Sequence, residues 1–325
     1  MPNAPICKNM QYQQKILGLG IVALTIALIG NNYLTISDRA HAAKLNQSIP
    51  TNILTYSSAI NFDVPNTADS KRFQAIMLNA IDRQLSNKTI GNIMQAIGYQ
   101  FLGTPYKAGL LDRSPNEKLI ISFQGFDCVL FVETVFALAQ GIARQDYNYP
   151  NFSDRLRQLR YRNGEINGYC SRLHYFSDWI LDNEKKGKIT NITANLGGIP
   201  LNKNFNFMTT HKSSYPQLSK NTNYQCILDV ETKLNNLKIH YIPNQRIYTV
   251  YNQLQAGDIV AIATDIQGLD VTHTGLVYRM PDGNIGFIHA SPNGSVRISS
   301  DLQNFVEKVN NSVGIIVARP QQPSR

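Results

Sequence analysis

One segment near the middle of the chain, residues 126–139, constrains the possible folds most. It begins Phe126-Asp127-Cys128 and then has apolar residues on nearly every helical face as far as Ala139. A helix that is apolar all round has to be covered by other elements on every side. The chain can supply that cover, because 43% of its 325 residues are apolar and only 16% are charged. This composition excludes low-complexity disorder and collagen-like repeats.

Two amphipathic helices are predicted before this buried helix. Residues 73–81 place their apolar side chains on one face at helical spacing. The second helix starts after Thr89, a candidate N-cap, and stops at residues 103–106, where Gly103 and Pro105 end it. The N-terminal half of the domain is therefore expected to be helical.

The C-terminal third has a different pattern. Short apolar runs at residues 258–264, 274–279, 286–290 and 313–318 are separated by Gly, Pro, Asn and Asp. They predict antiparallel strands, and residues 281–284, Pro-Asp-Gly-Asn, are a strong hairpin signal. Helices followed by strands are typical of an α+β domain. Residues 151–250 lie between the two parts, have mixed character and are interpreted as a large insertion.

The N-terminal residues are predicted to lie outside the domain. An apolar stretch at residues 16–30 follows Lys8 and Lys15, and Ala40-His41-Ala42 has the form of a signal-peptide cleavage site. The stretch is short for a bilayer span. We therefore expect a signal peptide at residues 1–42, a linker at 43–68 and the domain at 69–325. The alternative is an uncleaved N-terminal anchor, which would be the protein's one attachment to a membrane. Either way the protein is expected to be exported, to the periplasm or the cell envelope.

Cleavage after Ala42 would change both the charge and the cysteine count. The net charge would fall from +9 to +7, and three of four cysteines would remain. In an oxidising compartment an odd number indicates one unpaired thiol, which is Cys128 if Cys170 and Cys226 pair. The alternative is that all three are reduced and buried as small apolar side chains. The positive charge suits anionic partners but names none.

Cys128 and two histidines form a candidate catalytic group. A cysteine in the first turn of a helix, with Asp127 as N-cap, has its thiolate favoured by the helix dipole and the unpaired N–H groups. His273 and His289 flank the predicted hairpin, so they can converge near one end of it. A nucleophile, a base and a group that orients the base are what thiol catalysis needs. The alternative for Cys128 is an ordinary core cysteine.

The order of these motifs resembles the NlpC-type papain-like cell-wall hydrolases over residues 88–320. The matching segments are Gly103-Thr104-Pro105-Tyr106, Phe126-Asp127-Cys128, Ala256-Gly257-Asp258-Ile259-Val260, His273-Thr274-Gly275 and His289-Ala290-Ser291. Most of that superfamily has Ser-Gly after the cysteine, whereas this chain has Val129-Leu130. The residues after Cys128, together with residues 171–179, resemble the N-acetylmuramoyl-L-alanine amidase-like branch of the superfamily. That branch was long classed as a domain of unknown function.

The resemblance implies a fold and a set of roles. The fold is papain-like, with the nucleophile at the start of a buried helix packed on a C-terminal antiparallel sheet. Cys128 is implied as nucleophile, His273 as base and His289 as the orienting residue, while Tyr106 matches a tyrosine that lines the catalytic centre. The large insertion would select the substrate.

Four residues of that insertion are candidate substrate contacts. Arg172, His174, Asp178 and Trp179 could bind the carboxylates and the sugar of a muropeptide. The guanidinium of an arginine is well suited to binding a carboxylate. The alternatives are a surface charge for Arg172 and a core anchor for Trp179.

Other classes of site are poorly supported. The chain has neither a His-Glu-x-x-His motif nor paired Cys-x-x-Cys motifs, so neither a metal nor another cofactor is expected. Arginines at 155, 157, 160 and 162 are interpreted as a solvated helix face, because no nucleic-acid recognition fold or aromatic platform accompanies them.

The leading hypothesis is an exported, metal-independent cysteine hydrolase of peptidoglycan or muropeptides. The resemblance makes its target the amide between N-acetylmuramic acid and L-alanine. One alternative is an endopeptidase that cuts within the stem peptide. Others are a non-catalytic wall-binding module and acyl transfer to a lipid or amine by the same fold. The oligomeric state is left open.

Overall fold

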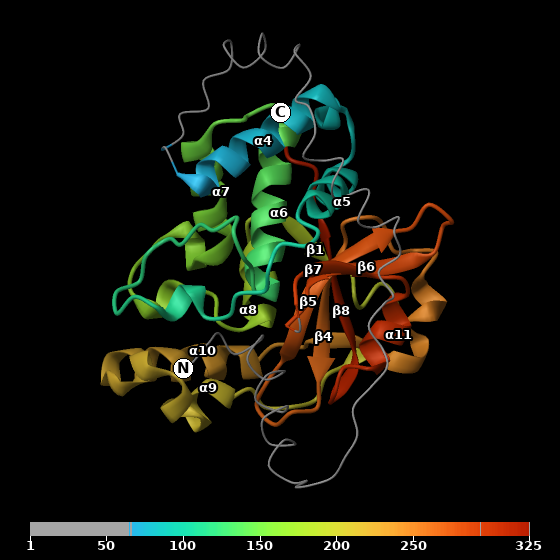
Figure 1. Ribbon diagram of the computed structural model, residues 1–325. Helices are drawn as coiled ribbons and strands as arrows, with labels where there is room; N and C mark the ends of the chain where they lie inside the picture. Colours follow the sequence, from blue (N-terminus) through green and yellow to red (C-terminus); the bar gives the residue numbers. More distant parts are fainter. Residues whose placement is uncertain (1–64, 66, 293, 325) are drawn as a thin grey trace, which may run out of the picture.

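A helical layer packs against one antiparallel sheet in the computed structural model of the protein (Figure 1). The structure describes residues 65, 67–292 and 294–324. The predicted signal peptide, residues 1–42, and nearly all of the predicted linker lie outside these residues. Among the described residues, no helix has both the length and the apolar character needed to cross a membrane.

The helices account for the first half of the domain and the strands for most of the second. The helices are α4 (Ala68–Asp82), α5 (Ile90–Gln100), α6 (Cys128–Ala143), α7 (Tyr149–Arg160), α8 (Phe176–Lys185), α9 (Phe207–Thr210), α10 (Asn221–Asn235) and α11 (Leu302–Glu307). The strands are β1 (Ile189–Asn191), β2 (Ile199–Pro200), β3 (His240–Pro243), β4 (Ile259–Thr264), β5 (Val271–Arg279), β6 (Ile285–Ala290), β7 (Val296–Ser299) and β8 (Ser312–Pro320).

Helix α6 is the predicted buried helix. The side chain of Asp127 accepts a hydrogen bond from the Leu130 N–H at 2.8 Å, so the predicted N-cap is confirmed. Every residue of α6 except Val129 is buried. The apolar residues of α5, α7 and α8 cover it within one core, as a helix without a polar face requires.

The predicted strands form the middle of one sheet with the order β2-β3-β8-β4-β5-β6-β7, and β1 pairs with β8. All neighbours are antiparallel. The predicted hairpin joins β5 to β6: the Met280 N–H donates to the Asn284 carbonyl at 2.9 Å, and Gly283 takes a φ of 88°. The four predicted strands are confirmed, whereas β1, β2, β3 and β7 went unpredicted.

The two faces of the sheet belong to different apolar cores. On one face Leu276 and Ile288 pack with α5 and α6. On the other face Val277 and Phe287 pack with Leu302 and Val306 of α11. Alternation along the strands therefore decides which helices a given side chain meets.

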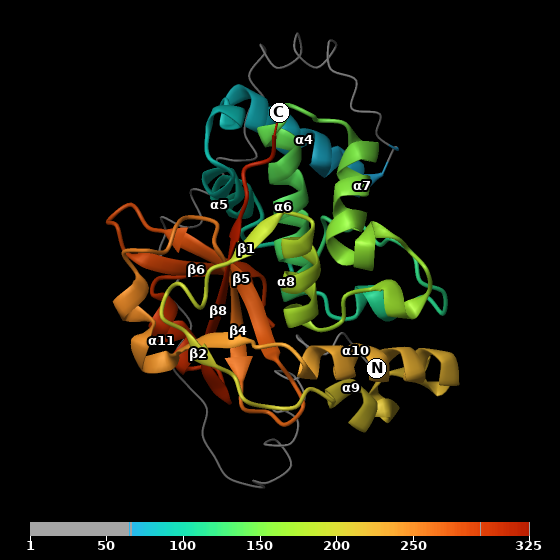
Figure 2. The ribbon, with the colours of Figure 1, turned by 180° about the vertical axis from the view of Figure 1, so that it is seen from behind.

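Residues 151–250 do not form one separate unit. Helices α7 and α8 lie beside α6 (Figures 1 and 2) and contribute to its core. Strands β1 and β3 pair with β8 of the main sheet. The segment around α9 and α10 has its own apolar cluster, and a disulfide between Cys170 and Cys226 ties α10 to the turn before α8. This confirms the pairing that the sequence left open.

Candidate active site

Two imidazoles meet where β5 and β6 pair. His273 Nε2 lies 2.8 Å from His289 Nδ1, a hydrogen-bond distance. The predicted convergence of the two histidines is therefore confirmed. Since His273 and Val277 are four residues apart on one strand, they share a face, and His289 shares that face with Phe287.

This pair is buried among aromatic rings. Both side chains have no exposed surface. The ring of Phe305, from α11, lies 4.4 Å from the His289 ring and 6.0 Å from the His273 ring, measured between centroids. Burial lowers the pKa of His273 to about 3. Burial also holds the pKa of His289 well below its usual value, and the charges of His273 and Arg297 lower it further. Both imidazoles are therefore neutral at pH 7.

The second ring nitrogen of His273, Nδ1, is not used in this pair. Since the Nε2 of His273 bonds to His289, only its Nδ1 can take part in another interaction. This Nδ1 is buried and has no hydrogen-bond partner among the described residues. Buried polar atoms are nearly always paired, so an exception calls for an explanation. A neutral imidazole with one nitrogen held and the other open has the arrangement of a general base.

Cys128 is the first residue of α6 and is fully buried. Burial raises the pKa of the neighbouring Asp127 to about 6, the charges of Glu133 and Asp112 add to this, and the Leu130 N–H and Arg160 oppose it. Asp127 is therefore partly protonated near neutral pH. No described cysteine is a free thiol, whereas the unpaired thiol is predicted for a chain that has lost residues 1–42 and so stays a prediction. The count assumed loss of residues 1–42, whereas the 325-residue chain has four cysteines. Thiolate chemistry at Cys128 thus requires a reduced side chain.

The start of α6 and the start of β5 lie at the same end of the molecule. The Ser177 N–H, in the first turn of α8, donates to Asp270 Oδ2 at 2.7 Å, and Asp270 directly precedes β5. Two residues later in α8, Trp179 Nε1 donates to Oε1 of Glu133 in α6 at 3.2 Å. In this way α8 joins the first turns of α6 to the β5 end that holds His273.

The geometry sets one condition on the predicted pairing of Cys128 and His273. Cys128 belongs to the core on the α6 face of the sheet, whereas the imidazoles are on the α11 face. His273 is the third residue of β5, where the register with β4 shifts beside Ile262. The Cys128 sulfur and the His273 Nδ1 can therefore meet only at the start of β5, where the two faces of the sheet come together. The role of Cys128 stays a prediction.

Tyr106 lies beside the start of α6. It forms an isolated bridge with Phe126, and its N–H donates to the Gly294 carbonyl at 2.8 Å. Burial raises the pKa of its phenol, and the charge of Asp127 raises it further. This phenol therefore stays protonated, and it lies near the N-cap of α6; its place in the catalytic centre stays a prediction.

Arg172 and His174 have internal partners. Arg172 is 3% exposed and pairs with Asp112 at 2.8 Å and with Glu117 at 3.3 Å. His174 Nε2 lies 2.9 Å from the Tyr169 carbonyl oxygen. Since two carboxylates already neutralise Arg172, it offers no unmatched charge to a substrate. The surface-charge alternative is wrong as well.

Asp178 and Trp179 also belong to the interior. Both oxygens of Asp178 accept from the guanidinium of Arg162. Trp179 has no exposed surface and stacks on Phe176 with ring centroids 4.9 Å apart. The prediction that these four residues contact substrate is therefore corrected: they hold the helical layer together. The core-anchor alternative for Trp179 is confirmed.

A buried ion pair at the centre of this layer was not predicted from the sequence. Arg160 Nε donates to Glu133 Oε2 at 2.7 Å, and both side chains are almost fully buried. Arg160 was interpreted as part of a solvated face. The available signal was Glu133 itself, a lone charge within an apolar helix, which needs a partner when buried. No group of three or more metal-ligating side chains occurs in the described ranges.

Comparison with known proteins decides the family. A model of the N-acetylmuramoyl-L-alanine amidase-like family matches residues 96–315, more than half of the chain. The chain belongs to this family. None of the curated proteins compared with it matches.

Several solved structures share the fold. An N-acetylmuramoyl-L-alanine amidase from Bacteroides uniformis is 30% identical with a TM-score of 0.67, covering 71% of this chain and 99% of its own. A Bacteroides fragilis protein provisionally described as a xylanase is 33% identical with a TM-score of 0.63, covering 68% and 98%. A Legionella pneumophila protein, 21% identical with a TM-score of 0.59 over 77% and 94%, shows the fold alone.

Proposed function

We propose that this member of the amidase-like family is an exported cysteine hydrolase that cleaves the amide between N-acetylmuramic acid and L-alanine. The observation that supports it most is the His273–His289 pair. His273 Nε2 lies 2.8 Å from His289 Nδ1, and the buried His273 Nδ1 has no hydrogen-bond partner among the described residues. Family membership and the named amidase among the similar structures support the substrate. The N-terminal apolar segment supports export.

The proposed reaction uses Cys128 as nucleophile and His273 as proton carrier. The Cys128 thiol gives its proton to His273, and the sulfur attacks the lactyl carbonyl carbon. The backbone N–H groups at the start of α6 can hold the oxyanion. A neighbouring thiolate favours the imidazolium and so offsets the burial that keeps His273 neutral.

The intermediate then collapses and water completes the reaction. The carbon–nitrogen bond breaks, His273 protonates the leaving amine of L-alanine, and a thioester remains on Cys128. Water attacks this thioester while His273 takes its proton. The sulfur leaves and is reprotonated, and N-acetylmuramic acid is released with a free carboxylate. His289 keeps the His273 ring in one orientation throughout.

The test is product analysis with a defined muropeptide and the reduced full-length protein. Mass spectrometry should find the intact stem peptide and free N-acetylmuramic acid. A dipeptide product would establish the endopeptidase alternative instead. Cys128→Ala and His273→Ala should lower the rate by at least about 10³-fold, as loss of a nucleophile or its base does.

Two controls separate chemistry from folding. His211→Gln changes an exposed histidine of the same chain and should keep the wild-type rate. Alkylation of the reduced protein should label Cys128 and abolish activity. Full hydrolysis by Cys128→Ala would exclude the thiol mechanism, and no hydrolysis by the reduced wild type would favour a wall-binding module.

A further inference from the structure

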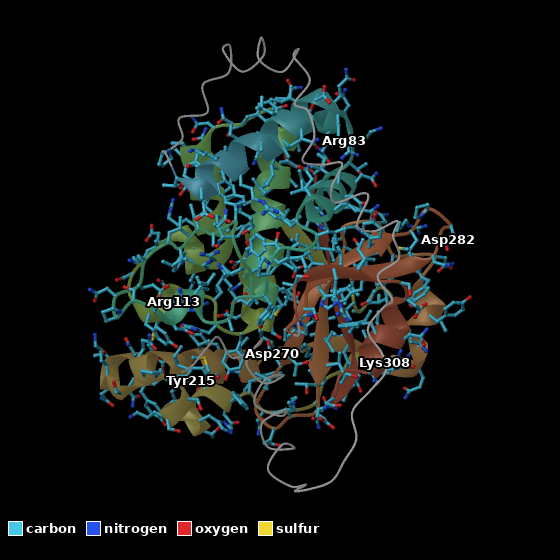
Figure 3. All side chains as sticks on the ribbon, in the orientation of Figure 1. Arg83, Arg113, Tyr215, Asp270, Asp282 and Lys308 are labelled. Carbon is cyan, nitrogen blue, oxygen red and sulfur yellow. A yellow bond between two sulfur atoms is a disulfide. The ribbon has the colours of Figure 1, made fainter. Side chains whose placement is uncertain are left out.

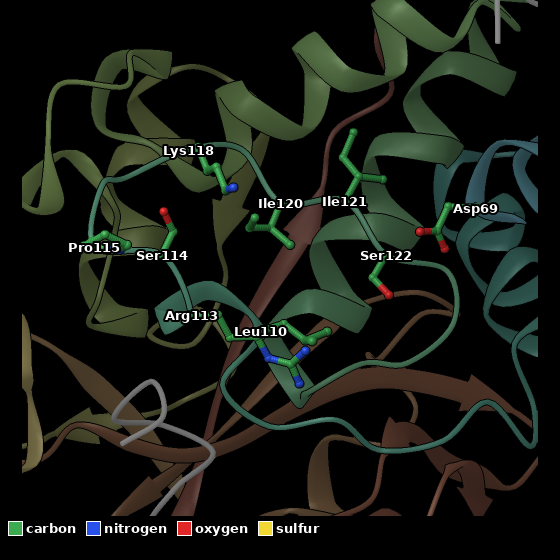
Figure 4. A pocket seen from close by; sticks show the side chains of 9 residues that line it. All are labelled: Asp69, Leu110, Arg113, Ser114, Pro115, Lys118, Ile120, Ile121 and Ser122. Atoms are coloured by element: carbon green, nitrogen blue, oxygen red, sulfur yellow. The ribbon is translucent and has the colours of Figure 1, made fainter. Parts of the chain in front are cut away.

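A pocket of about 580 Å³ lies on the helical side of the molecule (Figure 4). Its lining comes mainly from the segment between α5 and α6, and the apolar part includes Leu110, Ile120 and Ile121. Arg113 and Lys118 line it as well, and Asp69 of α4 lies across it from Lys118 (Figure 4). None of these residues belongs to the catalytic group described above.

The pocket walls are fixed by buried groups, so the pocket is preformed. At one side Asp112 and Glu117 are held by the buried guanidinium of Arg172. In the middle, Arg160 Nη1 donates to the Ile120 carbonyl at 2.5 Å. These arginines therefore shape the pocket from behind and leave its surface to other side chains.

The far wall is fixed in the same way. The Phe123 N–H donates to Asp69 Oδ1 at 2.7 Å, which joins the end of the segment to α4. Because this segment is held at both ends and in the middle, it loses little conformational entropy when a ligand binds.

Arg113 and Lys118 are the cations that the pocket presents to solvent. Both are exposed, and Figure 3 shows Arg113 at the edge of the helical side. Neither forms an ion pair with a described residue, unlike Arg155, Arg160 and Arg172 of the same layer. An arginine fork and an ammonium over an apolar floor are suited to a carboxylate on an aliphatic or peptide backbone.

The segment that lines the pocket leads along the chain into the start of α6, where Cys128 lies. Ser122, which lines it, precedes Cys128 by six residues. Asp112, next to Arg113, is near enough to the N-cap of α6 for its charge to raise the pKa of Asp127. A ligand in the pocket can therefore belong to a substrate whose reacting bond lies at that helix end.

We infer that this pocket binds the free carboxylates of the stem peptide, with Arg113 and Lys118 as the specificity-determining cations. This inference rests on the proposed function and deepens it by naming the part of the substrate that is recognised. The carboxylates face Arg113 and Lys118, because Asp69 repels them from the other side. The surface-exposed Arg113 thus takes the role that the sequence suggested for Arg172.

The test compares two muropeptides that differ only in having free or amidated stem-peptide carboxylates. Binding to reduced Cys128→Ala protein is measured by calorimetry, which needs no turnover. We expect Arg113→Gln and Lys118→Gln each to weaken binding of the free acid about tenfold and to leave the amidated ligand within about twofold. Arg83→Gln and Lys308→Gln, exposed changes elsewhere on the surface (Figure 3), should alter neither.

Kinetics give the second arm and separate the two proposals. With reduced enzyme, Arg113→Gln should raise KM for the free acid about tenfold at unchanged kcat. Equal losses for both ligands, or no loss, would overturn the pocket assignment. Suppose that Arg113→Gln binds the free acid more weakly than wild type, as predicted, but that wild type releases a dipeptide. The amidase proposal then fails and the pocket assignment stands.

Discussion

The buried imidazole of His273 should make the protein lose stability as the pH falls. Its pKa is about 3 in the folded protein and about 6.5 in an unfolded chain. Between these values the unfolded chain binds a proton that the folded protein does not, so the free energy of unfolding falls as the pH falls. The contribution of His273 is fully present above pH 6.5 and is lost progressively toward pH 3.

The size of the effect between pH 7 and pH 5 depends on the unfolded pKa alone, because the folded value lies well below 5. One histidine then costs about 2 kcal/mol of unfolding free energy. Asp127 acts in the opposite direction, since its pKa is raised to about 6 and the folded protein binds its proton first. The net wild-type slope therefore mixes several groups, and only a difference between variants isolates His273.

Urea unfolding at pH 7 and pH 5 provides the assay. The chain has one tryptophan, Trp179, which is fully buried, so its fluorescence reports unfolding. Wild type should lose about 2 kcal/mol more than His273→Gln over this interval, while the exposed His211→Gln control should match wild type. Equal losses in wild type and His273→Gln would refute a neutral, buried imidazole.

Two further predictions concern the helical layer. Glu133→Gln leaves Arg160 buried with an unmatched charge and should lower the unfolding free energy by about 3–5 kcal/mol in urea denaturation. Combining Glu133→Leu with Arg160→Met removes both charges and should recover most of the loss; failure to do so would contradict this account of the pair. Replacing Cys170 and Cys226 by Ala opens a loop with a sequence separation of 56 and should cost about 4 kcal/mol. An unchanged urea midpoint would show that the disulfide contributes little.

Elements with local signals could be predicted from the sequence. The cap of α6 depends on Asp127 and a residue three positions later, and the β5–β6 turn depends on residues 281–284. The meeting of His273 and His289 follows from that hairpin. Strands β1 and β2 are three and two residues long, too short to show an alternation.

The candidate substrate contacts failed for a tertiary reason. Arg172 is matched by Asp112 and Glu117, which lie more than fifty residues earlier in the chain. Nothing in residues 171–179 shows that these partners exist. Arg113, which the structure leaves exposed in a pocket, has no motif around it, so its role became visible only with the fold.

The most direct test of the proposed chemistry is the product released from a defined muropeptide by the reduced protein. Wild type and His211→Gln should both release free N-acetylmuramic acid and an intact stem peptide, whereas Cys128→Ala should release neither product. Intact stem peptide released by Cys128→Ala at the wild-type rate would contradict the role of Cys128 as nucleophile.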